Sequence, residues 1–284
     1  MLTDLAGWLA TPIGLRFAIG LGLAALVAAG AWASRALTAG GALGAVVVGT
    51  VVFGGGGPAW AALLVLFFAT SSLASRWRED RKARPAARFA KGNRRDLGQV
   101  VANGAVPAAM AALALRYPEA GLFAAFAGAV AAATADTWAT ELGLLSERPP
   151  ALITTGEPVP RGTSGGVTVV GTLAAVGGSA LVAAAAAVLL GARDLLEVGV
   201  LDARLIDWGA LRLLPIVMAS GLAGSVVDSL LGATVQATYR DEGGGPSAVT
   251  ERARDAAGRP AARVRGWRWM TNDVVNLIAT ACGA

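Results

Sequence analysis

The sequence contains no histidine, and this absence excludes several familiar kinds of site. Zinc sites with imidazole ligands, acid–base catalysis by histidine and haem ligation all require that side chain. The single cysteine, Cys282, rules out an internal disulfide and any cluster of thiolate metal ligands. Any bound metal ion must therefore be held by oxygen ligands, which is typical of Mg²⁺ or Mn²⁺.

Charged residues are also scarce. They make up 15% of the 284 residues, against about 25% in a typical soluble domain. Hydrophobic residues make up 55%, the mean hydropathy is +0.59, and long apolar runs recur along the chain. The sequence predicts an all-α polytopic membrane protein with seven or eight transmembrane helices, in a single domain over residues 1–284.

Eight apolar segments are expected, the last one short: 12–34, 40–53, 59–75, 97–115, 120–145, 165–190, 209–238 and 271–284. The connection 76–96 carries nine Lys or Arg residues, and such loops stay in the cytoplasm. The alternation of spans then places 146–164 and 240–268 in the cytoplasm too, with the N-terminus and the acidic segment 193–208 outside. This orientation predicts a protein of the cell's inner membrane whose motifs face the cytoplasm. It also accounts for the net charge of +5, so we expect no nucleic-acid partner.

Residues 135–143, Ala-Asp-Thr-Trp-Ala-Thr-Glu-Leu-Gly, place two carboxylates at the end of an apolar run. A carboxylate in or near a bilayer core costs at least about 2.5–3.5 kcal/mol, so such residues indicate function. On a helix, Asp136, Thr140 and Gly143 share a face, and Glu141 lies roughly 140° away. That face offers a carboxylate, a hydroxyl and a gap that a backbone or a phosphate can approach.

Polar residues recur in three other apolar segments. Asp228 follows a stripe of small residues, Asp273 lies between Asn272 and Asn276, and Asn103 lies four residues after Gln99. The asparagines have an alternative explanation, because amides in membrane helices often form interhelical hydrogen bonds.

Carboxylates at these depths need a positive partner. For Asp136 and Asp228 we expect that partner to be a bound metal ion or Arg161. Residues 160–166, Pro-Arg-Gly-Thr-Ser-Gly-Gly, supply this guanidinium together with two hydroxyls and three glycines, directly before an apolar run. Backbone amides at a helix start and an arginine form an anion site. The predicted nucleotide and phosphate ligands are Asn103, Thr140, Arg161, Gly162, Thr163, Ser164, Gly165, Gly166, Asn272 and Asn276.

Six blocks of the sequence resemble the signatures of one integral membrane family, known as domain of unknown function 92 or transmembrane-protein-19-like. The blocks are residues 98–104, 135–143, 152–155, 160–167, 227–233 and 272–277. The plant member of this family is phytyl-phosphate kinase, so the resemblance implies a kinase that uses CTP to convert an isoprenyl monophosphate into the diphosphate.

A more distant similarity points the same way. The Asp136–Gly143 block followed by Arg161–Gly166 resembles a pattern of dolichol and phytol kinases and of CDP-diacylglycerol synthases. Here Arg161 stands where a lysine is usual, and Gly165 where an acid is usual.

The expected function is therefore transfer of a phosphoryl group from CTP to a phytyl or polyprenyl monophosphate lying among the membrane lipids. The expected catalytic residues are Asp136, Glu141, Asp228 and Arg161, and the expected Mg²⁺ ligands are Asp136, Asp228 and Asp273. The acceptor phosphate is already ionised, so no strong base is required. The alternatives are a transporter or scramblase of lipid-linked phosphates, which would use the same carboxylates, and a CDP-lipid-type cytidylyltransferase.

Overall fold

The computed structural model describes residues 11–78, 94–117, 120–198, 208–240, 249–254 and 258–284. Its helices are α2 (Ile13–Ala33), α3 (Ala39–Gly56), α4 (Pro58–Arg76), α6 (Leu97–Ala114), α7 (Ala120–Gly143), α8 (Val169–Val198), α9 (Trp208–Thr234) and α10 (Asn272–Gly283). Within the described residues, the seven helices from α2 to α9 are long and apolar enough to cross a membrane. The prediction of an all-α polytopic membrane protein is confirmed.

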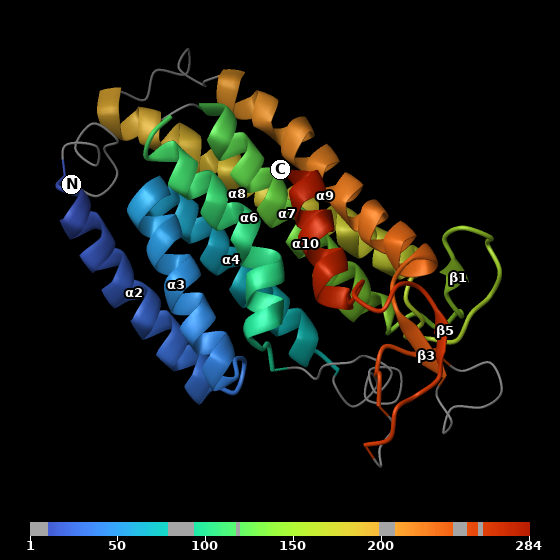
Figure 1. Cartoon of the computed structure of the whole chain (residues 1–284). Helices are drawn as coiled ribbons and strands as arrows, with labels where there is room; N and C mark the ends of the chain where they lie inside the picture. Colours follow the sequence, from blue (N-terminus) through green and yellow to red (C-terminus); the bar gives the residue numbers. More distant parts are fainter. Residues whose placement is uncertain (1–10, 79–93, 118–119, 199–207, 241–248, 255–257) are drawn as a thin grey trace.

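Helix α7 is the centre of the bundle, and it contacts α4, α6, α8, α9 and α10 (Figure 1). Alanine and glycine allow these close contacts in a membrane protein. Ala127 and Ala131 of α7 are fully buried, and a side chain at Gly128 would collide with the backbone of Gly283 in α10. Further towards the start of α7, Phe126 packs against Trp60 of α4, with ring centroids 4.6 Å apart.

Two small sheets, which the sequence did not predict, join the helices at one end of the bundle. Strands β1 (Ala151–Leu152) and β2 (Gly166–Val167) are antiparallel, and β3 (Thr238–Arg240) lies between β4 (Val249–Thr250) and β5 (Arg263–Arg265). Two expected helix ends are therefore wrong. Helix α8 begins at Val169 rather than residue 165, because Gly166 pairs with Leu152, and α9 ends at Thr234 because Thr238 pairs with Arg265.

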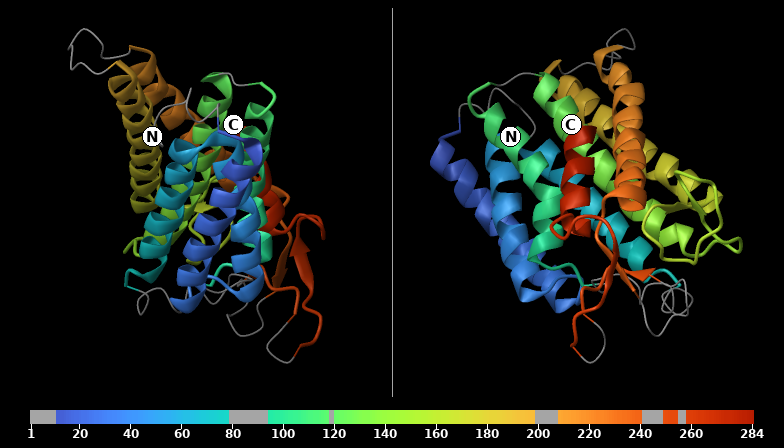
Figure 2. Two further views of the ribbon diagram at one scale, coloured as in Figure 1. Left: turned by 90° about the vertical axis from the view of Figure 1, so that its left-hand side faces the viewer. Right: turned by 45° about the vertical axis from the view of Figure 1, so that its right-hand side comes forward.

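The strands lie where α4, α7 and α9 end and where α6, α8 and α10 begin, as the two views of Figure 2 show together. The described parts of the segments 76–96, 146–164 and 240–268 are at this end. Residues 79–93, 241–248 and 255–257 of these predicted loops lie outside the described residues, as do residues 199–207 of the acidic segment.

Asp96 and Gln99 cap the start of α6. The side chain of Asp96 accepts a hydrogen bond from the amide of Gln99 at 2.9 Å, and the amide of Asp96 donates to the side chain of Gln99 at 3.1 Å. This capping box satisfies two amides that a helix start leaves without a partner. It also fixes the direction in which α6 leaves the loop, and so the position of Asn103 one turn later.

Candidate active site

A pocket of about 830 Å³ opens at the end of the bundle that carries the strands. All fourteen residues that the sequence predicts as site residues line it: Asn103, Asp136, Thr140, Glu141, Arg161, Gly162, Thr163, Ser164, Gly165, Gly166, Asp228, Asn272, Asp273 and Asn276. They come from α6, α7, α9, α10 and the 160–166 loop, so only the packing of the bundle brings them together.

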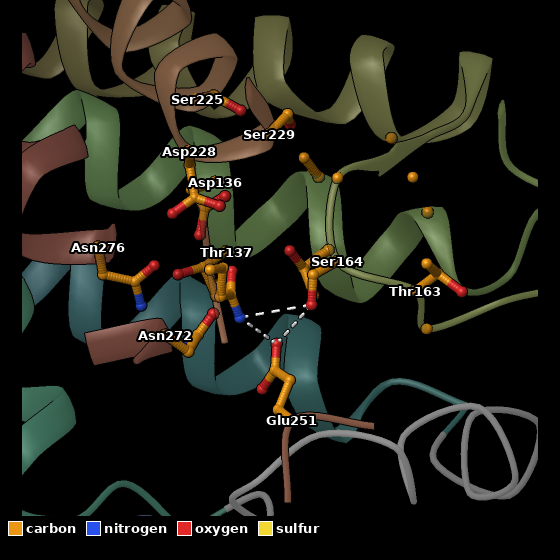
Figure 3. A pocket seen from close by; sticks show the side chains of 18 of the residues that line it. Asp136, Thr137, Thr163, Ser164, Ser225, Asp228, Ser229, Glu251, Asn272 and Asn276 are labelled. Atoms are coloured by element: carbon orange, nitrogen blue, oxygen red, sulfur yellow. Dashed lines mark hydrogen bonds between the residues drawn. The ribbon is translucent and has the colours of Figure 1, made fainter. Parts of the chain in front are cut away.

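Two aspartates form the centre of the pocket. Asp136 from α7 and Asp228 from α9 lie side by side, close enough for their carboxyl groups to interact directly (Figure 3). Oδ2 of Asp228 is buried and has no hydrogen-bond partner among the described residues. Two adjacent carboxylates repel one another unless a proton or a cation lies with them. The pair is therefore a candidate cation site.

The charges around the pocket also favour a bound cation. Its walls carry five carboxylates, from Asp136, Glu141, Asp228, Glu251 and Asp273, and three guanidinium groups, from Arg95, Arg161 and Arg252. Within the described part of the chain, no three of the acidic side chains come close enough together to enclose a metal ion. Asp273 thus shares the pocket with the aspartate pair without joining it in a three-carboxylate cluster. This arrangement suits Mg²⁺, which is usually bound by one or two carboxylates together with waters and ligand phosphates.

Glu141 lies at a different part of the wall from the aspartate pair. Its Oε1 accepts a hydrogen bond from Ser75 of α4 at 2.7 Å, and its charge acts on Arg95. Arg95 in turn donates to Ser72 at 2.9 Å and lies over the ring of Phe68 at 5.5 Å. Burial lowers the pKa of Arg95, and the Glu141 carboxylate opposes this shift. The contacts hold the Arg95 guanidinium as a fixed positive group in the pocket wall, a role that the sequence did not indicate.

The 160–166 loop closes one side of the pocket, but its amides are used differently from the prediction. The amide of Thr163 donates to the carbonyl of Pro160, and that of Gly166 donates to the carbonyl of Thr163. The prediction that these amides stand at a helix start is wrong, because α8 begins three residues after Gly166. Arg161 donates to the backbone carbonyl of Glu147 at 2.7 Å and lines the pocket.

Two further residues, Gln236 and Glu251, connect this loop to the C-terminal part of the chain. Oε1 of Glu251 accepts hydrogen bonds from Ser164 at 3.0 Å and from Gln236 at 2.8 Å (Figure 3). Glu251 also acts electrostatically on both Asp136 and Asp228. No sequence pattern pointed to either residue, since Glu251 lies in a loop that was assigned to topology and Gln236 is a single amide beyond α9.

The remaining predicted residues have simpler surroundings. Asn103 donates from its amide to the carbonyl of Gln99 at 3.0 Å, while Asn272 and Asn276 line the pocket from α10. Gly143 lies against α8, because a side chain there would meet Cα of Gly171 at 3.4 Å. The backbone of α8 thus approaches the predicted gap, and Gly143 also lines the pocket.

The Gln236–Glu251 hydrogen bond should contribute measurably to stability. Gln236 is 1% exposed, and a hydrogen bond to a charged group is worth about 1.5–3 kcal/mol, so Gln236→Leu is expected to lower the melting temperature by several degrees. Thermal unfolding of the detergent-solubilised protein measures this. Glu251→Gln, which keeps an acceptor oxygen, should have a smaller effect. An unchanged melting temperature for Gln236→Leu would show that the Gln236–Glu251 hydrogen bond does not stabilise the fold.

Comparison with known proteins agrees with the sequence motifs. The family model described as integral membrane protein DUF92 matches residues 22–284. The chain belongs to this family. Protein PGR from Arabidopsis thaliana is 33% identical over 231 residues, which are 75% of this chain and 77% of the plant protein. A protein of Methanocaldococcus jannaschii named as an uncharacterized membrane protein is 34% identical over 200 residues, 70% of this chain and 75% of its own length. No solved structure matches. The predicted family membership is confirmed.

Proposed function

We propose that this membrane protein is a phosphotransferase that uses CTP to convert an isoprenyl monophosphate, such as a phytyl or polyprenyl phosphate, into the diphosphate. The observation that carries the proposal is that the Asp136–Asp228 pair shares one pocket with the 160–166 loop and its arginine, Arg161. A carboxylate pair and guanidinium groups that line one pocket suit phosphoryl transfer, since that reaction depends on positioning and charge neutralisation.

In the proposed reaction an oxygen of the acceptor monophosphate forms a bond to the γ-phosphorus of CTP. The bond from that phosphorus to the β,γ-bridging oxygen breaks, and CDP leaves. Asp136 and Asp228 would hold Mg²⁺, which supplies neutralisation of the phosphate charge when it is bound. Arg161 and the hydroxyls of Thr163 and Ser164 would bind the triphosphate. No histidine is needed because the attacking oxygen is already ionised.

The other pocket residues support these groups. Arg95, held by Glu141 and Ser72, provides a second guanidinium for the phosphates on the α4 side of the pocket. Asn103, Asn272 and Asn276 line the pocket from α6 and α10 and would donate hydrogen bonds to phosphate or base oxygens. The basic connections around the pocket favour a cytoplasmic orientation in the cell membrane, where CTP is available.

The deciding experiment incubates the purified protein with Mg²⁺, a panel of isoprenyl monophosphates and one nucleoside triphosphate, labelled on the γ-phosphate in one series and on the base in another. Label in a lipid diphosphate, with CTP as the best donor, is the expected result. Label in a cytidylylated lipid would replace the kinase by a CDP-lipid synthase. Absence of any product, combined with movement of lipid phosphate between the leaflets of proteoliposomes, would favour a transporter or scramblase.

Arg161→Gln is expected to raise the KM for the nucleotide by about tenfold or more, because one charge-assisted contact to the triphosphate is lost. The matched control is Arg148→Gln, which removes an exposed guanidinium close to the same loop, outside the pocket lining. The measurement is the initial rate as a function of CTP concentration. Equal KM values for the two variants would remove Arg161 from the nucleotide site.

A further inference from the structure

We propose that the pocket has a second opening, a window between α8 and α9 that faces the membrane, through which the hydrocarbon chain of a phosphate-bearing lipid passes. Thr172 and Val226 form its rim. The identity of the lipid rests on the proposed function, but the window itself rests on the geometry of these two helices.

Two close contacts mark the ends of the window. At one end a side chain on Gly221 of α9 would lie 2.5 Å from Oγ of Ser179 in α8, so the two helices touch there. At the other end the 160–166 loop, which precedes α8, touches α9, because a side chain on Gly165 would collide with the backbone of Ala233. The stretch of α9 between these two contacts, residues 222–232, spans about 16 Å at the usual helical rise.

Between these contacts the pocket reaches the outer surface. Its lining includes Leu222, Ser225, Val226 and Ser229 of α9 and Gly171, Thr172 and Ala175 of α8. Val226 is 49% exposed, and Thr172 is exposed as well. Leu173, next to Thr172, and Leu230, one helical turn from Val226, are exposed without lining the pocket, so the pocket wall meets the outer surface here.

The outer surface around the window is apolar. The window lies within the candidate membrane spans Val169–Leu190 and Leu211–Thr234, beside Leu173 and Leu230, which are 66% and 40% exposed. Exposed leucines within a membrane span contact lipid chains. The opening therefore leads from hydrocarbon to the charged interior.

The change from an apolar outer surface to a polar pocket indicates the chemistry of the ligand. On the same part of α9 as Val226, the hydroxyls of Ser225 and Ser229 and the carboxylate of Asp228 line the pocket (Figure 3). A molecule that satisfies both regions carries a phosphate at one end and a hydrocarbon chain at the other. An isoprenyl monophosphate has this chemistry, and its phosphate would meet the aspartate pair while its chain stayed in the bilayer.

The test narrows the window with a large side chain. Val226→Trp is expected to raise the KM for a twenty-carbon isoprenyl monophosphate about tenfold or more, because a rigid ring then occupies the path of the chain. The KM for CTP and the turnover of a five-carbon isoprenyl monophosphate, which is water-soluble, should stay within about twofold of the wild type. Ile216→Trp is the matched control, since Ile216 is 53% exposed on the same helix, lies outside residues 222–232 and does not line the pocket.

A binding measurement separates this inference from the proposed function. Equilibrium binding of the labelled twenty-carbon monophosphate, without nucleotide, should be weakened by Val226→Trp and by Thr172→Trp on the opposite rim, and be unaffected by Ile216→Trp. If both rim variants fold, as judged by melting temperature, and bind like the wild type, the window is overturned. If they lose binding while the wild type transfers no phosphoryl group, the window stands and the kinase proposal fails. Equal binding of phosphatidic acid would overturn the isoprenyl assignment.

Discussion

Asp136→Asn is expected to reduce phosphoryl transfer by about a hundredfold or more, because the substitution removes a negative charge from the proposed Mg²⁺ site and preserves the size of the side chain. Asp136 is paired with Asp228 in the middle of the pocket, so the substitution removes one of the two carboxylates that would hold the metal ion. The initial rate should be measured over a range of Mg²⁺ concentrations. The variant should need more Mg²⁺, which a purely structural role of Asp136 would not produce.

The matched control for this substitution is Glu157→Gln. Glu157 is exposed in the connection between α7 and α8, and it does not line the pocket. Its replacement removes one carboxylate at the same end of the molecule and should leave the rate and the Mg²⁺ requirement unchanged. Wild-type activity in Asp136→Asn would contradict the metal assignment.

Gly165→Ala is expected to destabilise the protein much more than Gly156→Ala, although both glycines have a positive φ, +80° and +73°. The backbone conformation costs an L-residue about 1–2 kcal/mol in each case. At Gly165 the new methyl group would also collide with the backbone of Ala233, whereas nothing lies within 4 Å at Gly156. Overpacking of this kind adds about 1–3 kcal/mol.

Melting temperatures of the two variants measure the difference directly. In Gly165→Ala the 160–166 loop must also move away from α9, so its activity should fall together with its stability, while Gly156→Ala should remain active. Equal shifts in melting temperature would mean that the loop does not rest on α9. A loss of activity in both variants would point to the positive φ that the two glycines share rather than to the contact of Gly165 with α9.

Much of the fold was predictable because it depends on local patterns. The hydropathy of the chain located the seven long helices, and most of their ends to within a few residues. The polar residues of the pocket were predictable for a related reason. Carboxylates such as Asp136 and Asp228 are conspicuous within apolar segments, where charge is costly. Their pairing depends on the packing of α7 against α9, and no local pattern specifies it.

The residues that sequence reasoning missed have partners far along the chain. Ser164 lies 87 residues before Glu251, and Glu141 lies 66 residues after Ser75. Arg95 is one of nine basic residues in the loop 76–96, which the positive-inside bias already explained. Glu251 is one of four acidic residues in the loop 240–268, and no pattern distinguishes it from the others. The strands were missed because two or three residues are too few to show the alternation that indicates a sheet.

Helix α10 has a consequence for the biosynthesis of this protein. Its twelve residues extend about 18 Å, well short of the roughly 30 Å hydrocarbon layer, so it cannot cross the bilayer by itself. It is held instead by contacts such as those of Gly283 with Gly128 and of Thr280 with the carbonyl of Ala102. Since α10 packs between α6, α7 and α9, we expect these earlier helices to assemble first during translation and α10 to dock against them last. Asn272 and Asn276 line the pocket, so a nascent chain that stalls before this segment would enter the membrane without the α10 wall of the pocket.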